Sequence, residues 1–483
     1  MKRIVFVILS ISMMINLCII PVRGEENNLS SDYAVTQIIE QSMIDQTNKS
    51  GIYSDSEQSF MLFVSPSGAE TLAPQQILVK DDKIMIRNSF TQGDVLSWGA
   101  WRVLNDTEKQ NSNAIYVVCD GDHDELKIQA AIDNASPKAV IYPIGYCELT
   151  NDNVLETEKA VLYIKEGITL DGSYCDKMVF KNTSPSEGQI VFYMADSTTL
   201  RYIDFYEEAC TKETINPSIV YNVYGAKTNI EYNKFTNIYD SFLLGCYRET
   251  FCLPNSRFAH NEINGWEMYY DLVKPISFSI SNGICEQNSF DSLHADQYGR
   301  MWSINNSLFS GNSLSNCDFG GGRIEINGGG RTSGNVFKKV KNVDFDLNGN
   351  IINNTFISCS SSSTLINLHF ESIFEGNTIR SSRTNGDELI SMYNEVIISN
   401  NLFMRVVISP STKCLIGVHG YGSIKGNIIE PQITSEGVHE DFNLIYSTFN
   451  DYVICKDNIT SYPSIGLFEG KNNIISDNIV NAE

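Results

Sequence analysis

Asn335-Val-Phe337 and Asn354-Thr-Phe356 are two copies of one short motif: asparagine, any residue, then phenylalanine, isoleucine or leucine. The motif recurs through the C-terminal half of the chain at steps of 19 to 31 residues. The other copies are Asn233-Lys-Phe235, Asn261-Glu-Ile263, Asn288-Ser-Phe290, Asn312-Ser-Leu314, Asn377-Thr-Ile379, Asn400-Asn-Leu402 and Asn427-Ile-Ile429, with looser echoes at Asn458 and Asn478. Such a period indicates a solenoid, in which each repeat is one coil stacked on its neighbours.

The physics of a stacked β-coil accounts for both residue types of the motif. An inward asparagine at a turn can bond to the asparagines of the coils above and below. Asparagine also tolerates the left-handed backbone of a sharp corner. The apolar residue two positions later points to the same side of its strand and fills the core. We therefore predict an all-β fold, a right-handed parallel β-helix, whose solvent-facing turns vary in length.

One helix is predicted before the repeats, over residues 122–135, with Leu126, Ile128, Ala131 and Ile132 near one face. Acidic residues fill its first turn, as expected at a helix N-terminus. Since a solenoid needs its open core end covered, we expect this helix to cap the β-helix.

The chain divides into three parts by pattern. Residues 1–24 have a basic start, an apolar run and a small residue at a cleavage site, which is the layout of a secretory signal peptide. Residues 25–110 do not follow the coil pattern and are predicted to form a small β-rich module or an extended cap. Residues 111–483 form the predicted β-helix domain. The expected location is therefore secreted, outside the cell.

The first coils resemble a known superfamily. Asp120-Gly-Asp-His-Asp-Glu125, Ile128-Gln-Ala-Ala-Ile-Asp133 and Val140-Ile-Tyr-Pro-Ile-Gly-Tyr146 are similar to the opening of pectate-lyase-like proteins, which also occurs in phage tailspikes. Ile164-Lys-Glu-Gly-Ile-Thr-Leu-Asp-Gly172 is similar to their next coil. The resemblance implies a polysaccharide-handling β-helix. It does not fix the reaction, because this fold hosts lyases, hydrolases, epimerases and inert adhesins.

Charge limits the partners. Removing residues 1–24 takes the formal charge from −23 to −26, because that segment holds three basic residues and no acidic one. Such a surface repels nucleic acid and anionic lipid, so neither is an expected partner, and no membrane association is expected after signal cleavage. We expect no cofactor, although a divalent cation such as calcium could bind between carboxylates. A homotrimer is conceivable, but nothing in the sequence demands one.

Candidate catalytic residues gather in two consecutive coils. His294 and Asp296 are two residues apart, so on a strand they share a face, and Arg323 and Glu325 do likewise. If the two pairs lie on adjacent strands, an acid/base pair, a second carboxylate and a charge-stabilising guanidinium converge. The alternatives are a structural histidine, a turn-capping aspartate and an exposed salt bridge between Arg323 and Glu325.

The same region holds candidate substrate-binding residues, because aromatic faces stack on sugar rings. These are Trp266, Tyr269, Tyr270, Arg300 and Trp302, and the alternative is that the aromatics belong to the core. Two other groups of ionisable residues have ordinary structural explanations. Asp344 and Asp346 follow an ordinary half-buried strand pattern. His369 and Glu371 are expected on a lateral surface.

The sequence therefore favours a secreted protein that processes polysaccharide by cleaving glycosidic bonds, as a hydrolase or a lyase. The competing interpretation is a non-catalytic glycan-binding adhesin or a structural surface β-helix protein. A carboxylate pair at catalytic separation would favour the enzyme.

Overall fold

The computed structural model describes two parts of the chain, Met1–Lys109 and Gln110–Glu483. In the first part only seven strands are described, and in the second, residues 113–480 with internal gaps. The gaps are residues 120, 122, 153–154, 156–159, 184–189, 209–217, 224, 240–250, 269–275, 296–300, 328–329, 434–436, 438, 440, 448–451, 464–465 and 469–472. The proposed signal peptide, residues 1–24, lies outside the described residues.

The strands of the first part form a sheet in the order β1-β2-β3-β4-β5-β6, with β7 paired to β5. Only β1 and β2 run parallel, and the other pairs are antiparallel. Their bounds are β1 (Thr36–Ile38), β2 (Gly51–Ser54), β3 (Phe60–Val64), β4 (Gln75–Lys80), β5 (Lys83–Gln92), β6 (Val95–Trp98) and β7 (Arg102–Val103).

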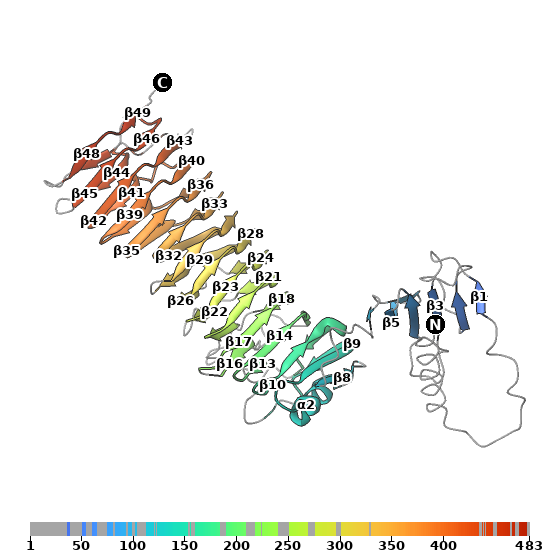
Figure 1. Cartoon of the computed structure of the whole chain (residues 1–483). Helices are drawn as coiled ribbons and strands as arrows, with labels where there is room; N and C mark the ends of the chain where they lie inside the picture. Colours follow the sequence, from blue (N-terminus) through green and yellow to red (C-terminus); the bar gives the residue numbers. More distant parts are fainter. Residues whose placement is uncertain are drawn as a thin grey trace, which may run out of the picture. The chain divides into compact units, whose positions relative to one another are not determined.

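The second part is a parallel β-solenoid, which confirms the predicted fold class (Figure 1). Each coil adds one strand to each of three faces. Face 1 holds β10 (Ala160–Ile164), β13 (Ile190–Met194), β16 (Ser218–Asn222), β19 (Phe251–Pro254), β22 (Ile276–Ser281), β26 (Met301–Asn305), β29 (Asp318–Asn327), β32 (Lys341–Ile352), β35 (Ile366–Glu375), β38 (Glu388–Tyr393), β41 (Cys414–Val418), β44 (Asn443–Ser447) and β47 (Gly466–Phe468).

Face 2 begins with β8 (Ala114–Val118) and the first half of β9 (Val140–Thr150), and the second halves of β32 and β35 also belong to it. Its other strands are β11 (Thr169–Asp171), β14 (Thr198–Arg201), β17 (Thr228–Glu231), β20 (Arg257–Ala259), β23 (Ile284–Glu286), β27 (Leu308–Ser310), β30 (Arg331–Ser333), β39 (Val396–Ser399), β42 (Tyr421–Lys425), β45 (Tyr452–Lys456) and β48 (Ile474–Ser476).

Face 3 begins with the second half of β9. It continues through β12 (Cys175–Lys181), β15 (Asp204–Glu208), β18 (Lys234–Tyr239), β21 (Glu262–Met268), β24 (Ser289–Asp291), β28 (Ser313–Ser315), β31 (Val336–Lys338), β33 (Thr355–Ile357), β36 (Thr378–Arg380), β40 (Leu402–Ile408), β43 (Ile428–Ile433), β46 (Ile459–Thr460) and β49 (Ile479–Val480). Short extra segments are η3 (Gly172–Tyr174), β25 (His294–Ala295), β34 (Ser360–Ser361) and β37 (Arg383–Thr384).

The asparagines of the motif form one buried ladder at the corner between faces 2 and 3. Each amide nitrogen donates to the amide oxygen of the next coil, at 2.8 to 3.1 Å, from Asn233 to Asn478. The same oxygen also accepts the backbone N–H of the preceding ladder residue, as Asn335 does from Asn312 at 2.9 Å. The ladder therefore satisfies both amide groups without water.

Two details of the ladder differ from the prediction. Its member in one coil is Asn401, which bonds to Asn377 and Asn427, and not Asn400. The left-handed residue of the corner is the one before each ladder asparagine, as at Asn353 (φ 57°) and Asn400 (φ 56°). The preceding residue makes the turn. The ladder asparagines therefore contribute their hydrogen bonds and not a left-handed backbone.

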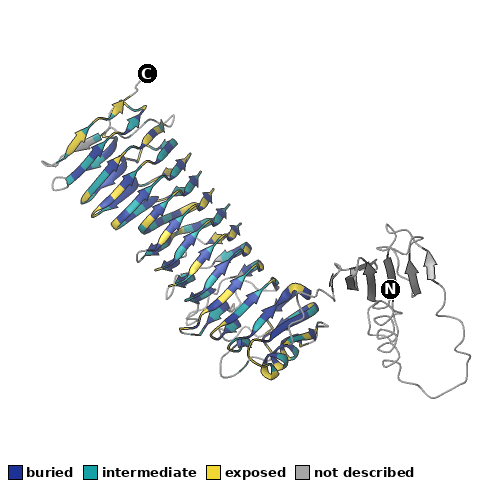
Figure 2. Ribbon diagram, viewed as in Figure 1, coloured by how far each residue is buried: buried dark blue, intermediate teal, exposed yellow. Residues whose placement is uncertain are grey.

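The apolar position of the motif fills the core, as predicted. Phe235, Phe290, Phe337 and Phe356 lie two residues after ladder asparagines and are at most 1% exposed. Figure 2 shows such buried residues recurring from coil to coil along the solenoid. Stacked coils bury these side chains against one another, because a single coil encloses no core.

The predicted helix is α2 (Asp124–Asn134), which packs against β8, β9 and β10. Ile128 and Ile132 are buried in the solenoid core. Leu126 is 48% exposed and does not share their face, since Asp124 and Glu125 are buried instead and accept hydrogen bonds from β9. The role of α2 as a cap stays a prediction.

Candidate functional site

Two of the predicted sugar-stacking residues are part of the core. Trp266 on β21 and Trp302 on β26 are 0% exposed, and their rings stack on each other with centroids 5.9 Å apart. Strand alternation turns both side chains inward, so neither ring can reach a ligand. The expected aromatic face is therefore not made by these tryptophans. Four other predicted site residues, Tyr269, Tyr270, Asp296 and Arg300, lie outside the described residues.

His294 is exposed and lies away from the predicted Arg323–Glu325 partners along the strand. Its register partners are Glu267 and Asp318. The register of β29 shifts between Asp318 and Gly322, and the partner of Arg323 is Met301. The expected convergence of His294 with the Arg323–Glu325 pair is therefore not seen in the register.

Arg323 and Glu325 instead meet a set of polar residues on the following strands of face 1. The outward positions of β32 place Asp344 beside Arg323, and Asp346 beside Glu325. The intervening Ile324 and Ile326 point into the core. We call the outward set the polar cluster; it comprises Arg323, Glu325, Asp344, Asp346, Asn367, His369, Glu388, Ser391, Tyr393 and His419.

Asp346 is the centre of the polar cluster. Its carboxylate accepts a hydrogen bond from Arg323 Nη1 at 2.9 Å and one from Asn367 Nδ2 at 2.8 Å. His369 Nε2 lies 3.9 Å from Oδ1, the carboxylate oxygen that also accepts from Asn367. The side chain of Asp346 is only 14% exposed, so these groups replace much of its water.

These contacts set the charge of Asp346. Burial acts to raise the pKa of its carboxyl, but His369, Asn367 and Arg323 favour the ionised form more strongly. The pKa of Asp346 therefore lies below its ordinary value, and the group is an anion near neutral pH.

A column of rings borders Asp346 on the C-terminal side. His369 stacks on Tyr393 with centroids 5.1 Å apart, and Tyr393 stacks on His419 at 5.1 Å. His419 Nε2 lies 2.8 Å and 3.0 Å from the two carboxylate oxygens of Glu388. Because the rings stack face to face along the solenoid, their polar edges are what this column presents outward.

Two further carboxylates are held by neutral donors. Asn327 donates to Glu325, and Ser363 donates to Asp344 at 2.7 Å. Ser361 also donates to Asp344. The arrangement thus sets two carboxylates, Glu325 and Asp346, side by side on adjacent strands, with a guanidinium and an imidazole against one of them. Carboxylates so placed can act as proton donor and as base or nucleophile.

Acid should remove the stabilisation that Asp346 provides. Its folded-state pKa lies below the unfolded value, so the stabilisation is present above the unfolded pKa and is lost as pH falls through the folded pKa. Relative to Asp346→Asn, the wild-type chain should be more stable to urea near neutral pH and should lose that advantage as the pH falls below the ordinary range of an aspartate carboxyl. A stability difference that does not change with pH would contradict the assignment.

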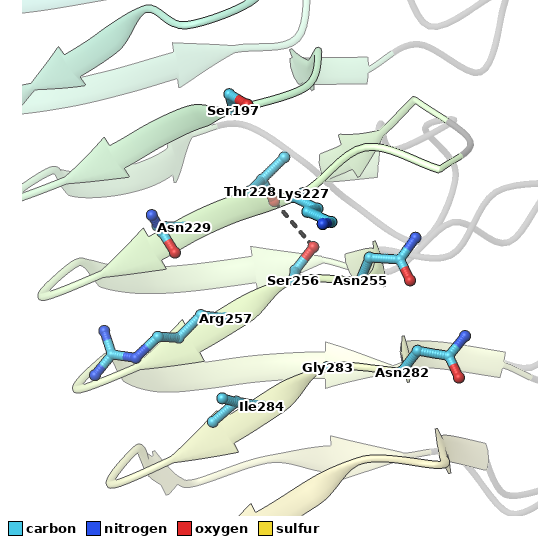
Figure 3. A pocket seen from close by; sticks show the side chains of 10 residues that line it. All are labelled: Ser197, Lys227, Thr228, Asn229, Asn255, Ser256, Arg257, Asn282, Gly283 and Ile284. Carbon is cyan, nitrogen blue, oxygen red and sulfur yellow. Dashed lines mark hydrogen bonds between the residues drawn. The ribbon is translucent and has the colours of Figure 1, made fainter.

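A separate shallow groove of about 530 Å³ lies over β17, β20 and β23. Asn255 and Asn282 line one side, and Asn229 and Arg257 the other (Figure 3). Arg257 is paired with Glu231 and with Glu286, so its charge is largely neutralised. None of the residues lining the groove is acidic. The hydroxyls of Thr228 and Ser256 are buried and bonded to each other, so the groove offers a ligand the amides of Asn229, Asn255 and Asn282 and the ammonium of Lys227.

Two absences hold for the described residues alone. No helix among them is long and apolar enough to cross a membrane. Within the same ranges, no three histidine, cysteine, aspartate or glutamate side chains are grouped as ligands for a metal ion.

The chain matches no protein-family model and no curated protein sequence. It is similar to the solved A-module of a mannuronan C-5 epimerase from Azotobacter vinelandii, with 12% identity, a TM-score of 0.34, and 74% of this chain and 96% of that chain covered. The catalytic unit of an α-1,3-glucanase from Streptomyces thermodiastaticus gives 8% identity, a TM-score of 0.35, and coverage of 92% and 85%.

An exopolygalacturonase from Yersinia enterocolitica gives 9% identity, a TM-score of 0.34, and coverage of 78% and 84%. At such identities and TM-scores the similarity says nothing of substrate or reaction in this chain. The strand pairing of the chain itself establishes the parallel solenoid.

Proposed function

We propose that this chain is a secreted hydrolase that cleaves a neutral polysaccharide at the polar cluster of face 1. The observation that carries the proposal is the adjacent pair Glu325 and Asp346, with Arg323 bonded to one member of the pair. Glycosidic hydrolysis needs two carboxyl groups, one protonated and one ionised.

The environment of Asp346 assigns the roles of the two groups. Asp346 is held as an anion by His369, Asn367 and Arg323, so it is the base or nucleophile. Glu325, its register partner on β29, takes the remaining role of proton donor. Arg323 and His369 act through Asp346 and are positioning residues. Glu325 and Asp346 are register partners on neighbouring strands, which lie about 4.8 Å apart.

Charge favours a hydrolase over a lyase. A polysaccharide lyase removes a proton beside a sugar carboxylate, so its substrate is acidic and needs cations. The polar cluster sets four carboxylates against one guanidinium and two imidazoles, and the whole chain carries a net charge of −23. Such a face repels an acidic polymer.

Three tyrosines extend face 1 toward the N-terminal coils. Tyr163, Tyr193 and Tyr221 occupy one outward column, with ring centroids 5.8 and 5.9 Å apart. The same column then passes through three short side chains, Cys252, Ser279 and Ser303, and reaches Glu325. Tyr221 and Glu325 are thus four strands, or roughly 19 Å, apart. A polymer lying along the column would contact both.

Replacing Tyr193 by alanine should raise KM about fivefold and leave kcat unchanged, because the ring would contribute binding without touching the cleaved bond. The matched control is Tyr421→Ala, which removes an exposed tyrosine from β42 on face 2 and should leave KM unchanged. Equal effects of the two substitutions, or a loss confined to kcat, would place the polymer elsewhere. The measurement is initial rates over a range of polysaccharide concentrations.

Product release from a panel of neutral and acidic polysaccharides tests the proposal itself. Reducing ends from a neutral polymer, without the ultraviolet absorbance of unsaturated sugars, are the expected result. Absorbance from an acidic polymer would instead indicate a lyase and overturn the assignment of a neutral substrate. No cofactor is part of the proposed reaction, so chelation of calcium should leave the rate unchanged.

Non-catalytic glycan binding is the second candidate, and the groove over β17, β20 and β23 favours it. The amides of Asn229, Asn255 and Asn282 match the hydroxyl groups of a sugar, and no acidic residue lines the groove. Binding without cleavage, weakened by Asn229→Ala but not by Asp346→Asn, would move the assignment to an adhesin.

A further inference from the structure

Three cysteines from consecutive passes of the chain meet at the N-terminal end of the solenoid. Cys119 follows β8 and donates its backbone N–H to Ile144 at 2.9 Å. Cys175 begins β12 and is in register with Gly145. Cys147 lies between them on β9, and its sulfur is 3.3 Å from that of Cys175. The neighbouring strands on both sides of β9 therefore each bring a thiol toward Cys147.

We propose that Cys147 and Cys175 form a disulfide in the mature protein, which joins the first coil to the second. The two sulfurs are free thiols in this structure. An S–S bond is about 2.05 Å long, so the sulfurs must approach by a little over an ångström. The register at Cys175 is already irregular, because the pairing with β9 shifts between Cys175 and Lys177.

The exposure of the two thiols determines which of them reacts first with an oxidant. Cys175 is partly exposed, whereas Cys147 is fully buried. The thiolate of Cys175 attacks a small disulfide such as oxidised glutathione, releases one glutathione thiolate and forms a mixed disulfide. The sulfur of Cys147 then attacks the Cys175 sulfur, and the departing glutathione thiolate takes up the Cys147 proton and leaves as the second glutathione. One disulfide is reduced to two thiols while two protein thiols are oxidised, so atoms and electrons balance.

Cys119 is the competing partner. Hydrogen bonds with Cys119 and Cys175, together with burial, raise the pKa of the Cys147 thiol. The sulfur of Cys119 also lies 3.8 Å from the Val117 carbonyl oxygen, and the residue is only 7% exposed. A small oxidant therefore reaches Cys175 before it reaches Cys119, which selects the Cys147–Cys175 pair.

The test uses the full chain, treated with oxidised glutathione, denatured with an alkylating agent and mapped by mass spectrometry without reduction. A peptide pair joined through Cys147 and Cys175 is expected in the wild type and in Cys119→Ser. The bond closes a loop between residues 28 apart, so oxidation should raise the melting temperature by roughly 4 °C. Cys175→Ser should show no such rise.

Two results would overturn the proposal. One is complete alkylation of both Cys147 and Cys175 in the treated wild-type chain. The other is a bond that joins Cys147 to Cys119. Both are read from the wild-type protein, so neither depends on whether a variant folds.

Discussion

Asp346→Asn is expected to lower kcat/KM for the cleaved polysaccharide by about a hundredfold or more, because positioned acid–base groups contribute factors of that size. The amide keeps the shape of the side chain but cannot carry the negative charge that Arg323 and His369 hold in place. Substrate binding should change little, so the loss should lie in kcat. Rates on the polymer identified by product release provide the measurement.

The matched control for that substitution is Asp318→Asn. Asp318 lies on the same strand as Glu325 but is the register partner of His294, outside the polar cluster. Its replacement should leave kcat/KM within about twofold, since it touches no proposed catalytic group. If Asp318→Asn and His294→Ala abolish cleavage while Asp346→Asn does not, the reaction belongs to the His294 side of β29.

Sequence periodicity was sufficient to predict the solenoid, because the motif places an inward asparagine and an inward apolar residue in each coil where it occurs. It could not resolve which of two consecutive asparagines, Asn400 or Asn401, belongs to the ladder. Both satisfy the spacing, and only the hydrogen bonds of Asn401 to its neighbours decide the matter. The helix was likewise predicted, but Leu126 was wrongly assigned to its buried face, because Asp124 and Glu125 take that place through hydrogen bonds to β9.

The candidate site was harder to predict than the fold. Arg323 and Glu325 share one face, as the spacing predicts, but their partners were sought in the preceding coil. Asp344 and Asp346 on the following strand have the same alternation, and this pattern alone is also that of any half-buried strand. The register of neighbouring strands brings these opposite charges together. It depends on the length of each turn, so it cannot be derived from a single sequence. Trp302 shows the same difficulty, because its spacing does not tell a core ring from an exposed one.

The ladder carries the largest expected effect on stability. Asn335→Ala should lower the free energy of unfolding by about 4 kcal/mol, because buried polar groups left unsatisfied cost about 1 to 3 kcal/mol each. The Asn335 amide donates to Phe309 at 2.8 Å and to Asn354 at 2.8 Å, and it accepts two bonds from Asn312. Asn335 is 0% exposed, so water cannot replace these bonds without opening the corner.

Asn478→Ala is the matched control for the ladder. Asn478 accepts from Asn458 and donates to the Cys455 carbonyl at 3.1 Å, but it is only partly buried in the last described coil. The groups that it leaves behind can bond to water, so its replacement should cost about 1 kcal/mol. Urea unfolding of the two variants measures the difference. Equal losses would show that burial of the amide is not what makes the ladder stabilising, and that the corner is held by its apolar residues instead.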